Sequence, residues 1–165
     1  MSVRSPIGGD TPKQFHWNHK HSKKHGISIS IDFDGCLVEN AYPRVGGDAG
    51  AWPYLKKLHD AGASLMLNTA RSLSHSWSAS TPEEVAERLQ AALSYVDEQC
   101  GKYDMTIDVV SMRLPGKLHA HIYLDDHGLG CPTKMVDGQP CVDWSIVGPW
   151  LLRIAGIKDT QDEVY

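Results

Sequence analysis

The chain has 165 residues and a formal net charge of −4, with 41% hydrophobic and 22% charged residues. This composition is typical of one globular domain and excludes a fibrous or wholly disordered protein. There is no apolar run of the roughly 20 residues that a membrane helix needs. The N-terminal segment also lacks the apolar stretch of a secretory signal, so we expect a cytoplasmic protein without a membrane segment.

The charge is unevenly distributed along the chain. Residues 1–26 carry five Lys and Arg side chains against one Asp, and they are rich in His. We expect this segment to be a flexible extension that is either solvated or in contact with phosphate groups. The sequence predicts one ordered domain over 27–155, followed by a tail over 156–165.

Hydrophobic patterns predict strands that alternate with helices. Residues 27–33 alternate apolar and polar side chains, which indicates a strand, and residues 63–69 form a second one. Between them, apolar residues at helical spacing predict a helix over 49–61, which Gly62 ends.

The second half of the chain continues this alternation. The run Thr81-Pro82-Glu83-Glu84 is typical of a helix start, with Thr81 as the N-cap. Two further strands are predicted over 106–110 and 119–124, and a final amphipathic helix over 145–154.

A β-hairpin is predicted between the last strand and the last helix. Asp137-Gly138 is a two-residue turn signal, and such a turn would place Lys134 opposite Cys141. Cys131 would then lie outside the pairing, so a disulfide between Cys131 and Cys141 is disfavoured and reduced thiols are expected.

Alternating strands and helices predict a parallel sheet, because each strand returns through a right-handed crossover. The predicted fold class is α/β, a Rossmann-like three-layer α/β/α sandwich with a mainly parallel sheet. Ligands bind such sheets beyond the carboxyl ends of the strands, so residues at these ends are the candidate site residues.

Acidic and hydroxyl side chains collect at these strand ends. Asp32 and Asp34 would share one site if the first strand continues, or have separate roles if the chain bends at Gly35. Clustered carboxylates repel one another unless a cation neutralises them, and oxygen ligands suit Mg²⁺. The other candidates are Thr69, Ala70, Arg71, Lys117, Asp125 and Asp126.

The order of these motifs resembles that of the haloacid dehalogenase superfamily. Its four motifs occur in sequence as Asp32-Phe33-Asp34-Gly35, Leu67-Asn68-Thr69, Lys117 and Asp125-Asp126. The runs around Thr69 and Lys117 are similar to those of small phosphatase-like members from phage and bacteria, with Leu118 where these have Pro. The short interval between Asp34 and the helix near residue 49 implies a minimal cap or none.

The resemblance implies a Mg²⁺-dependent phosphomonoester hydrolase. Asp32 would attack phosphorus and form an aspartyl phosphate, while Asp34 would protonate the leaving oxygen and later activate water. The implied substrate contacts are Thr69, Ala70, Arg71 and Lys117. The implied metal ligands are Asp32, the Asp34 carbonyl, Asp125 and Asp126, the last either as a direct ligand or as an outer partner.

Two individual assignments stay open at this level. Arg71 either contacts a substrate phosphate or forms a salt bridge to a neighbouring acid. His119 and His121 lie on one face of a predicted strand and could bind zinc, but no third ligand is evident and a structural role is favoured.

Alternative functions also stay open. One is a non-catalytic phosphate-binding regulatory module, and another is a polynucleotide end phosphatase whose basic N-terminal segment holds the strand. The expected partner is a phosphorylated substrate, with a small molecule favoured over a nucleic acid. A second copy of the chain could cover an open site. Segments 36–48 and 131–141 are the candidates for contacting the leaving group and so for determining substrate specificity.

Overall fold

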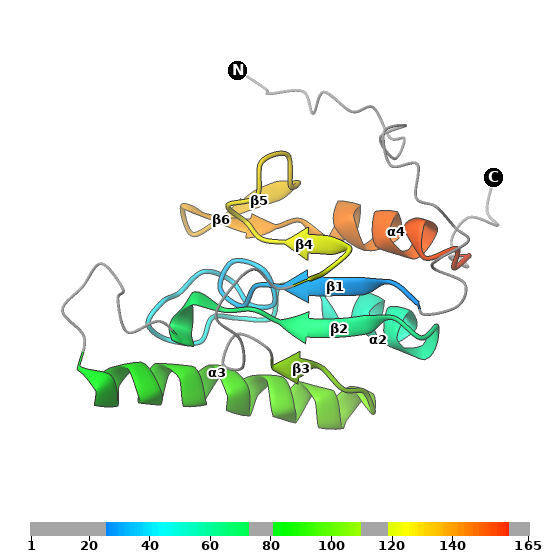
Figure 1. The fold of residues 1–165 in the computed structure, drawn as a ribbon. Helices are drawn as coiled ribbons and strands as arrows, with labels where there is room; N and C mark the ends of the chain where they lie inside the picture. The colour runs from blue at the N-terminus through cyan, green and yellow to red at the C-terminus, as the bar shows by residue number, and fades with distance from the viewer. Residues whose placement is uncertain (1–25, 73–80, 110–118, 159–165) are drawn as a thin grey trace, which may run out of the picture.

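The computed structural model describes residues 26–72, 81–109 and 119–158, which form a parallel α/β fold (Figure 1). The sheet has the strand order β3-β2-β1-β4. Its strands are β1 (Ser28–Ile31), β2 (Ser64–Leu67), β3 (Asp108–Val109) and β4 (Ile122–Leu124). All neighbours pair in parallel, so the carboxyl ends of the four strands lie along one edge. The α/β fold class predicted from the sequence is confirmed.

Helices flank this sheet. They are α2 (Trp52–Asp60), the short 3-10 helix η1 (Ala70–Ser72), α3 (Pro82–Tyr103) and α4 (Trp144–Ile154). Helix α2 packs against α4, α3 and β2, and α3 extends along the β3 edge of the sheet (Figure 1).

Helix α3 begins where the sequence predicts. The Thr81 hydroxyl accepts the N–H of Glu84, and the Glu84 carboxylate accepts the N–H of Thr81. This reciprocal capping box satisfies two backbone donors that the first helical turn would otherwise leave without a partner.

The strand β1 is shorter than predicted and ends in a tight turn. The Phe33 carbonyl accepts N–H groups from Cys36, Leu37 and Val38, at 3.3, 3.0 and 3.1 Å. The turn thus begins at Phe33 and contains Asp34 and Gly35, whose φ is +69°. The chain bends at Gly35, one of the two possibilities that the sequence left open.

The loop between β1 and α2 is compact and has no regular helix or strand of its own. Isolated bridges join Val38 to Asp34 and to Asp48. Ala49 and Ala51 are buried at its end. This loop is the interval for which a minimal cap or none was expected, and its role as a cap stays a prediction.

Strand β1 lies at the centre of the core. Ile29 and Ile31 are completely buried, and so are Leu67 on β2 and Leu55 on α2. Even Ser30, on the other face of the strand, is 3% exposed. A strand covered on both faces gives the residues that follow it a rigid base.

The predicted hairpin forms with the predicted register. Strands β5 (Thr133–Val136) and β6 (Gln139–Val142) are antiparallel, and Lys134 pairs with Cys141. Asp137 and Gly138 both have positive φ, as a type I′ turn requires. Val142 N–H donates to the Gly35 carbonyl at 2.7 Å, which attaches the hairpin to the turn after β1.

Two further expectations concern the two ends of the chain and the absence of a membrane segment. The predicted extension over 1–26 and the tail over 156–165 lie almost entirely outside the described residues. In the ranges that the structure describes, none of the helices combines the length and apolar character needed to span a membrane.

Candidate metal centre and active site

The register of the sheet aligns the ends of three strands. Ile31 at the end of β1 is level with Leu67 on β2 and with Leu124 on β4. Asp32 and Asp125, which follow β1 and β4, are therefore side by side, and the Asp32 N–H donates to the Leu124 carbonyl at 3.0 Å. This edge is where a parallel sheet offers a ligand site.

Three of the predicted carboxylates form one cluster at this edge. Oxygens of Asp32, Asp125 and Asp126 all lie within 4.8 Å of one another. The Asp125 carboxylate also accepts the N–H of His127 at 2.8 Å, which orients it within the turn after β4. Three carboxylates from two adjacent strands thus converge on a single point.

Asp126 is the most confined member of the cluster. Its side chain is 1% exposed, and neither carboxylate oxygen has a hydrogen bond with any part of the chain that the structure describes. His127 Nε2 lies 3.7 Å from Oδ2, and a Cβ atom at Gly35 would lie 2.5 Å from the same oxygen. Because a buried carboxylate without a hydrogen bond is costly, these oxygens fit a bound cation.

The electrostatics of the cluster point the same way. Burial raises the pKa of Asp32 from 3.8 to about 7, and repulsion from Asp125, Asp34 and Asp126 adds to this effect. Burial likewise raises the pKa of Asp126 above its usual range. Without a cation, the site therefore disfavours the ionised form of both acids.

The predicted hydroxyl residue, Thr69, lies just after the end of β2. Asn68 N–H donates to the Ile31 carbonyl at 2.9 Å, which holds the segment against β1. The next residue, Thr69, is 3% exposed, and its Oγ1 accepts the N–H of Arg71 at 3.2 Å. Ala70, which begins η1, is exposed.

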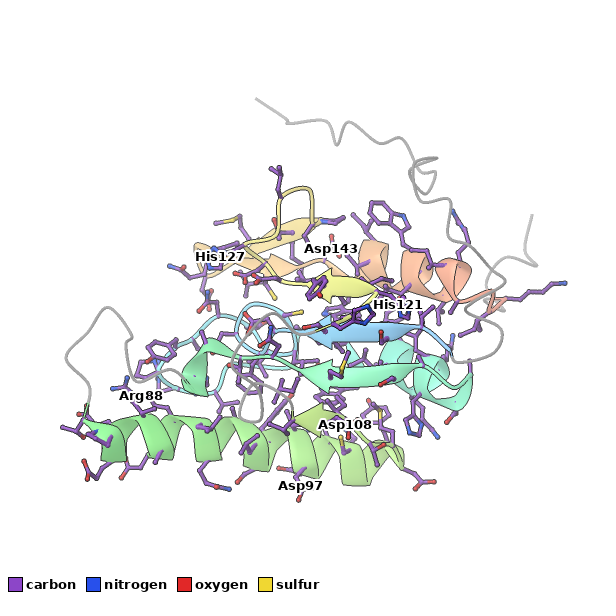
Figure 2. All side chains as sticks on the ribbon, viewed as in Figure 1. Arg88, Asp97, Asp108, His121, His127 and Asp143 are labelled. Carbon is purple, nitrogen blue, oxygen red and sulfur yellow. The ribbon has the colours of Figure 1, made fainter. Side chains whose placement is uncertain are left out.

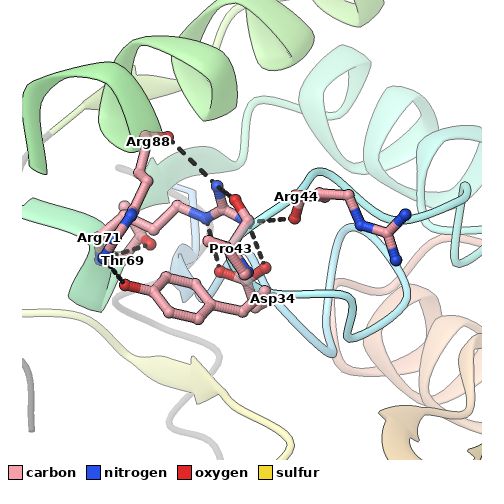
Figure 3. Close-up of polar contacts among 7 residues, drawn as sticks. Asp34, Pro43, Arg44, Thr69, Arg71 and Arg88 are labelled. Carbon is pink, nitrogen blue, oxygen red and sulfur yellow. Dashed lines mark hydrogen bonds and ion pairs between the residues drawn. The ribbon is translucent and has the colours of Figure 1, made fainter. Parts of the chain in front are cut away.

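Asp34 is not a member of the carboxylate cluster. Its two oxygens accept hydrogen bonds from Arg71, Oδ2 from Nε at 2.7 Å and Oδ1 from Nη2 at 2.6 Å (Figure 3). The turn that begins at Phe33 separates the Asp34 carboxylate from that of Asp32. Of the two arrangements that the sequence allowed for these acids, the structure has separate positions. A role for the Asp34 carbonyl as a metal ligand stays a prediction.

The structure also distinguishes between the two interpretations of Arg71. Its side chain is 1% exposed and forms the salt bridge to Asp34. Every N–H of its guanidinium group donates within the chain. The structure therefore has the internal salt bridge, one of the two interpretations that the sequence allowed, and the remaining donors of Arg71 are taken by the backbone carbonyls of Pro43, Arg44 and Arg88. Contact of Arg71 with a substrate phosphate stays a prediction.

The remaining candidates are Lys117 and the pair His119 and His121. Lys117 falls in 110–118, outside the described residues. His121 precedes β4 at the amino end of the strand, where its Nδ1 accepts the Ser28 N–H at 2.9 Å. The ring of His119 is 6.1 Å from that of His121. The backbone bond gives His121 the structural role favoured from the sequence.

Sequence reasoning identified Gly35 only as a turn residue and missed its contact with Asp126. Gly35 has a φ of +69° and is pressed against the Asp126 carboxylate, so a side chain has no room there. Only the pairing of β1 with β4 brings the two residues together, and neighbouring residues in the sequence carry no signal of it.

The comparisons with known proteins are limited to one structural likeness. No family model matches the chain, and no curated protein matches it in sequence. A solved structure of a conserved protein from Bacteroides thetaiotaomicron is similar, with 20% sequence identity and a TM-score of 0.48. The likeness covers 84% of this chain and 97% of that one.

Proposed function

We propose that the chain is a Mg²⁺-dependent phosphomonoester hydrolase that works through an aspartyl phosphate on Asp32. The observation that carries the proposal is the cluster of Asp32, Asp125 and Asp126, whose innermost carboxylate has no hydrogen bond within the described residues. Three carboxylates this close require a cation to be ionised together. The motif order that resembles the haloacid dehalogenase superfamily supports the same function.

The donor set suits a hard divalent cation. Asp32, Asp125 and Asp126 offer carboxylate oxygens from two adjacent strands, and Mg²⁺ prefers oxygen ligands in a compact arrangement. When bound, Mg²⁺ supplies positive charge that offsets the charge of these acids and of a phosphoryl group.

The side chains then divide the chemistry between them. A carboxylate oxygen of Asp32 attacks phosphorus, and the bond from phosphorus to the leaving oxygen breaks as Asp34 gives that oxygen a proton. For this step Asp34 has to be protonated and released from Arg71, because the salt bridge favours the ionised carboxylate. In the second step, Asp34 takes a proton from water while the water oxygen attacks phosphorus and the bond to Asp32 breaks. Thr69, at the end of the neighbouring strand, would position a phosphoryl oxygen.

The test is Mg²⁺-dependent phosphate release from sugar phosphates, nucleotides, nucleic-acid ends and phosphopeptides, with Asp32→Asn as the critical variant. We expect Asp32→Asn to lower turnover by several orders of magnitude, because the amide cannot act as the nucleophile. Asp97→Asn is the matched control. It makes the same chemical change on the exposed surface of α3, where Figure 2 labels the residue, and it should keep wild-type turnover.

Two outcomes would contradict the proposal. Unchanged turnover in folded Asp32→Asn would exclude the covalent step at this residue. Saturable Mg²⁺-dependent binding of phosphate compounds, with no hydrolysis of any of the four classes, would instead support the non-catalytic module.

A further inference from the structure

Tyr42 lies at the edge of the candidate site, in the loop between β1 and α2. The two residues that follow it are bonded to the same guanidinium group as Asp34 (Figure 3). Arg71 Nη1 donates to the Pro43 carbonyl at 3.0 Å, and Nη2 donates to the Arg44 carbonyl at 2.7 Å. These bonds place this part of the loop directly beside the Asp34 carboxylate.

Two arginines hold the Tyr42 side chain in place. Its hydroxyl accepts a hydrogen bond from Arg88 Nη1 at 2.7 Å. The guanidinium carbons of Arg71 and Arg88 each lie 5.4 Å from the centroid of its ring, within the range of cation–π attraction. A ring that is already fixed loses little conformational freedom when a ligand packs on it.

Tyr42 is nevertheless 44% exposed to solvent. An aromatic ring that is held in place and still exposed beside a polar site is typical of a surface on which planar groups stack. Arg44, two residues further along the loop, is also exposed. This edge of the site therefore combines an aromatic ring with a positive charge.

The proposed chemistry assigns this side of the site to the leaving group. Asp32 attacks phosphorus from the carboxylate cluster, and the leaving oxygen departs on the opposite side, because the attacking and leaving oxygens are roughly in line. Asp34, which acts on the leaving oxygen, lies apart from the cluster and beside the loop that carries Tyr42. The group bonded to the leaving oxygen is therefore directed toward this loop.

We propose that the Tyr42 ring stacks on the base of a nucleoside leaving group, so that the substrate is a phosphate ester of a nucleoside. Every nucleobase has a planar face that stacks on an aromatic side chain. The positive charge of Arg44 suits the further phosphates of a nucleotide chain. This inference rests on the proposed function and adds the class of substrate to it.

The experiment compares kcat/KM for thymidine 5′-phosphate and for deoxyribose 5-phosphate, which carries the same phosphate on the same sugar without the base. We expect the wild-type protein to prefer the nucleotide. Tyr42→Leu should lower kcat/KM about 10-fold or more for the nucleotide and less than about 3-fold for the sugar phosphate, because only the base stacks on the ring. Tyr42→Phe loses the bond to Arg88 but keeps the ring, so it should keep most of the preference.

Tyr123→Leu is the matched control. Tyr123 on β4 is also 44% exposed, and its hydroxyl accepts the Ala120 N–H at 3.1 Å, at the amino end of that strand. The variant thus removes an equally exposed tyrosine ring whose hydroxyl is bonded at the end of the strand opposite to the carboxylate cluster. It should change kcat/KM for neither substrate.

An oligonucleotide with a terminal phosphate distinguishes the two sources of such a substrate. A higher kcat/KM for the oligonucleotide than for thymidine 5′-phosphate, lowered by Tyr42→Leu, identifies the end of a nucleic acid as the substrate. The opposite order, with the same effect of Tyr42→Leu, identifies a free nucleotide.

The outcomes separate this inference from the proposed function. Equal losses for the two substrates in Tyr42→Leu, or no loss, overturn the stacking role alone, and so does a wild-type protein that is active on another class of phosphate ester without preferring the nucleotide. A preference lost as fully in Tyr42→Phe as in Tyr42→Leu also overturns it, because the ring is then not what matters. If the wild-type protein hydrolyses none of the four classes above, the proposed function and the role of Tyr42 fall together.

Discussion

The position of Asp32 in the fold directly affects the chemistry proposed for it. It follows the buried central strand and lies beside Asp125, and burial is the largest reason that its pKa rises to about 7. This partial burial disfavours the ionised acid in the metal-free protein. A bound cation would reverse this preference.

The raised pKa predicts how the stability of the metal-free protein depends on pH. Between about pH 4 and pH 7 the folded state holds a proton on Asp32 that the unfolded state has lost, so the free energy of unfolding falls as pH rises through this window. The fall is at most about 4 kcal/mol for one group with this shift. Asp126 acts in the same direction.

Urea unfolding at pH 5 and pH 8, in the presence of a chelator, measures this effect. Asp32→Asn has no titrating group at this position, so its stability should change less than that of the wild type between the two pH values. Equal changes in the two proteins would contradict the assignment of the raised pKa to Asp32.

The packing of helix α4 on α2 depends on a glycine. Tyr54 of α2 stacks on Trp144 of α4 with ring centroids 6.4 Å apart, and a Cβ atom at Gly148 would lie 2.5 Å from the Tyr54 ring. Trp144 Nε1 also donates to the Cys36 carbonyl at 2.7 Å, so α4 is attached to the loop beside the candidate site. The close contact of the two helices thus supports the loop after β1.

We therefore expect Gly148→Ala to destabilise the protein by about 1–3 kcal/mol, because the rigid ring must move, although alanine favours a helix more than glycine does. Gly101→Ala on α3 is the matched control. Nothing lies within 4 Å of a Cβ atom there, so the free energy of unfolding should stay the same or rise by up to about 1 kcal/mol. Thermal or urea unfolding of both variants decides the matter, and equal effects would contradict the packing argument.

At the scale of the whole molecule, the carboxylate cluster joins elements that are far apart in the chain. Asp32 follows β1, whereas Asp125 and Asp126 follow β4, and the hairpin is attached through Val142 to Gly35. A ligand that binds this cluster only in the folded state stabilises the fold as a unit, because unfolding must release it.

We expect Mg²⁺ to raise the melting temperature. A concentration one hundred times the Kd contributes about 2.7 kcal/mol of stability, which corresponds to several degrees for a domain of this size. Asp126→Asn should reduce or abolish the Mg²⁺-dependent shift, whereas Asp97→Asn should keep it. A wild-type protein whose melting temperature is the same with Mg²⁺ and with a chelator would contradict the predicted metal site.

The sequence alone determined the order of the elements and the main local signals. The alternation of apolar residues predicted four strands and the helices between them, and the Thr81 cap formed as expected. The Asp137-Gly138 turn also produced the predicted pairing of Lys134 with Cys141. These features depend on residues that are close together in the chain, so local sequence was sufficient. The candidate acids were predicted for a related reason, since each directly follows a recognisable strand.

Only the tertiary structure decided how those acids divide between two sites. The turn that begins at Phe33 separates Asp34 from Asp32, and Arg71, which bonds to Asp34, follows the end of another strand. Two further contacts join segments far apart in sequence. Gly35 packs against the Asp126 carboxylate, and backbone carbonyls of the loop before α2 and of α3 accept hydrogen bonds from Arg71. Such contacts depend on strand order, on the exact end of a strand and on which donors remain available after packing, and no local pattern encodes these.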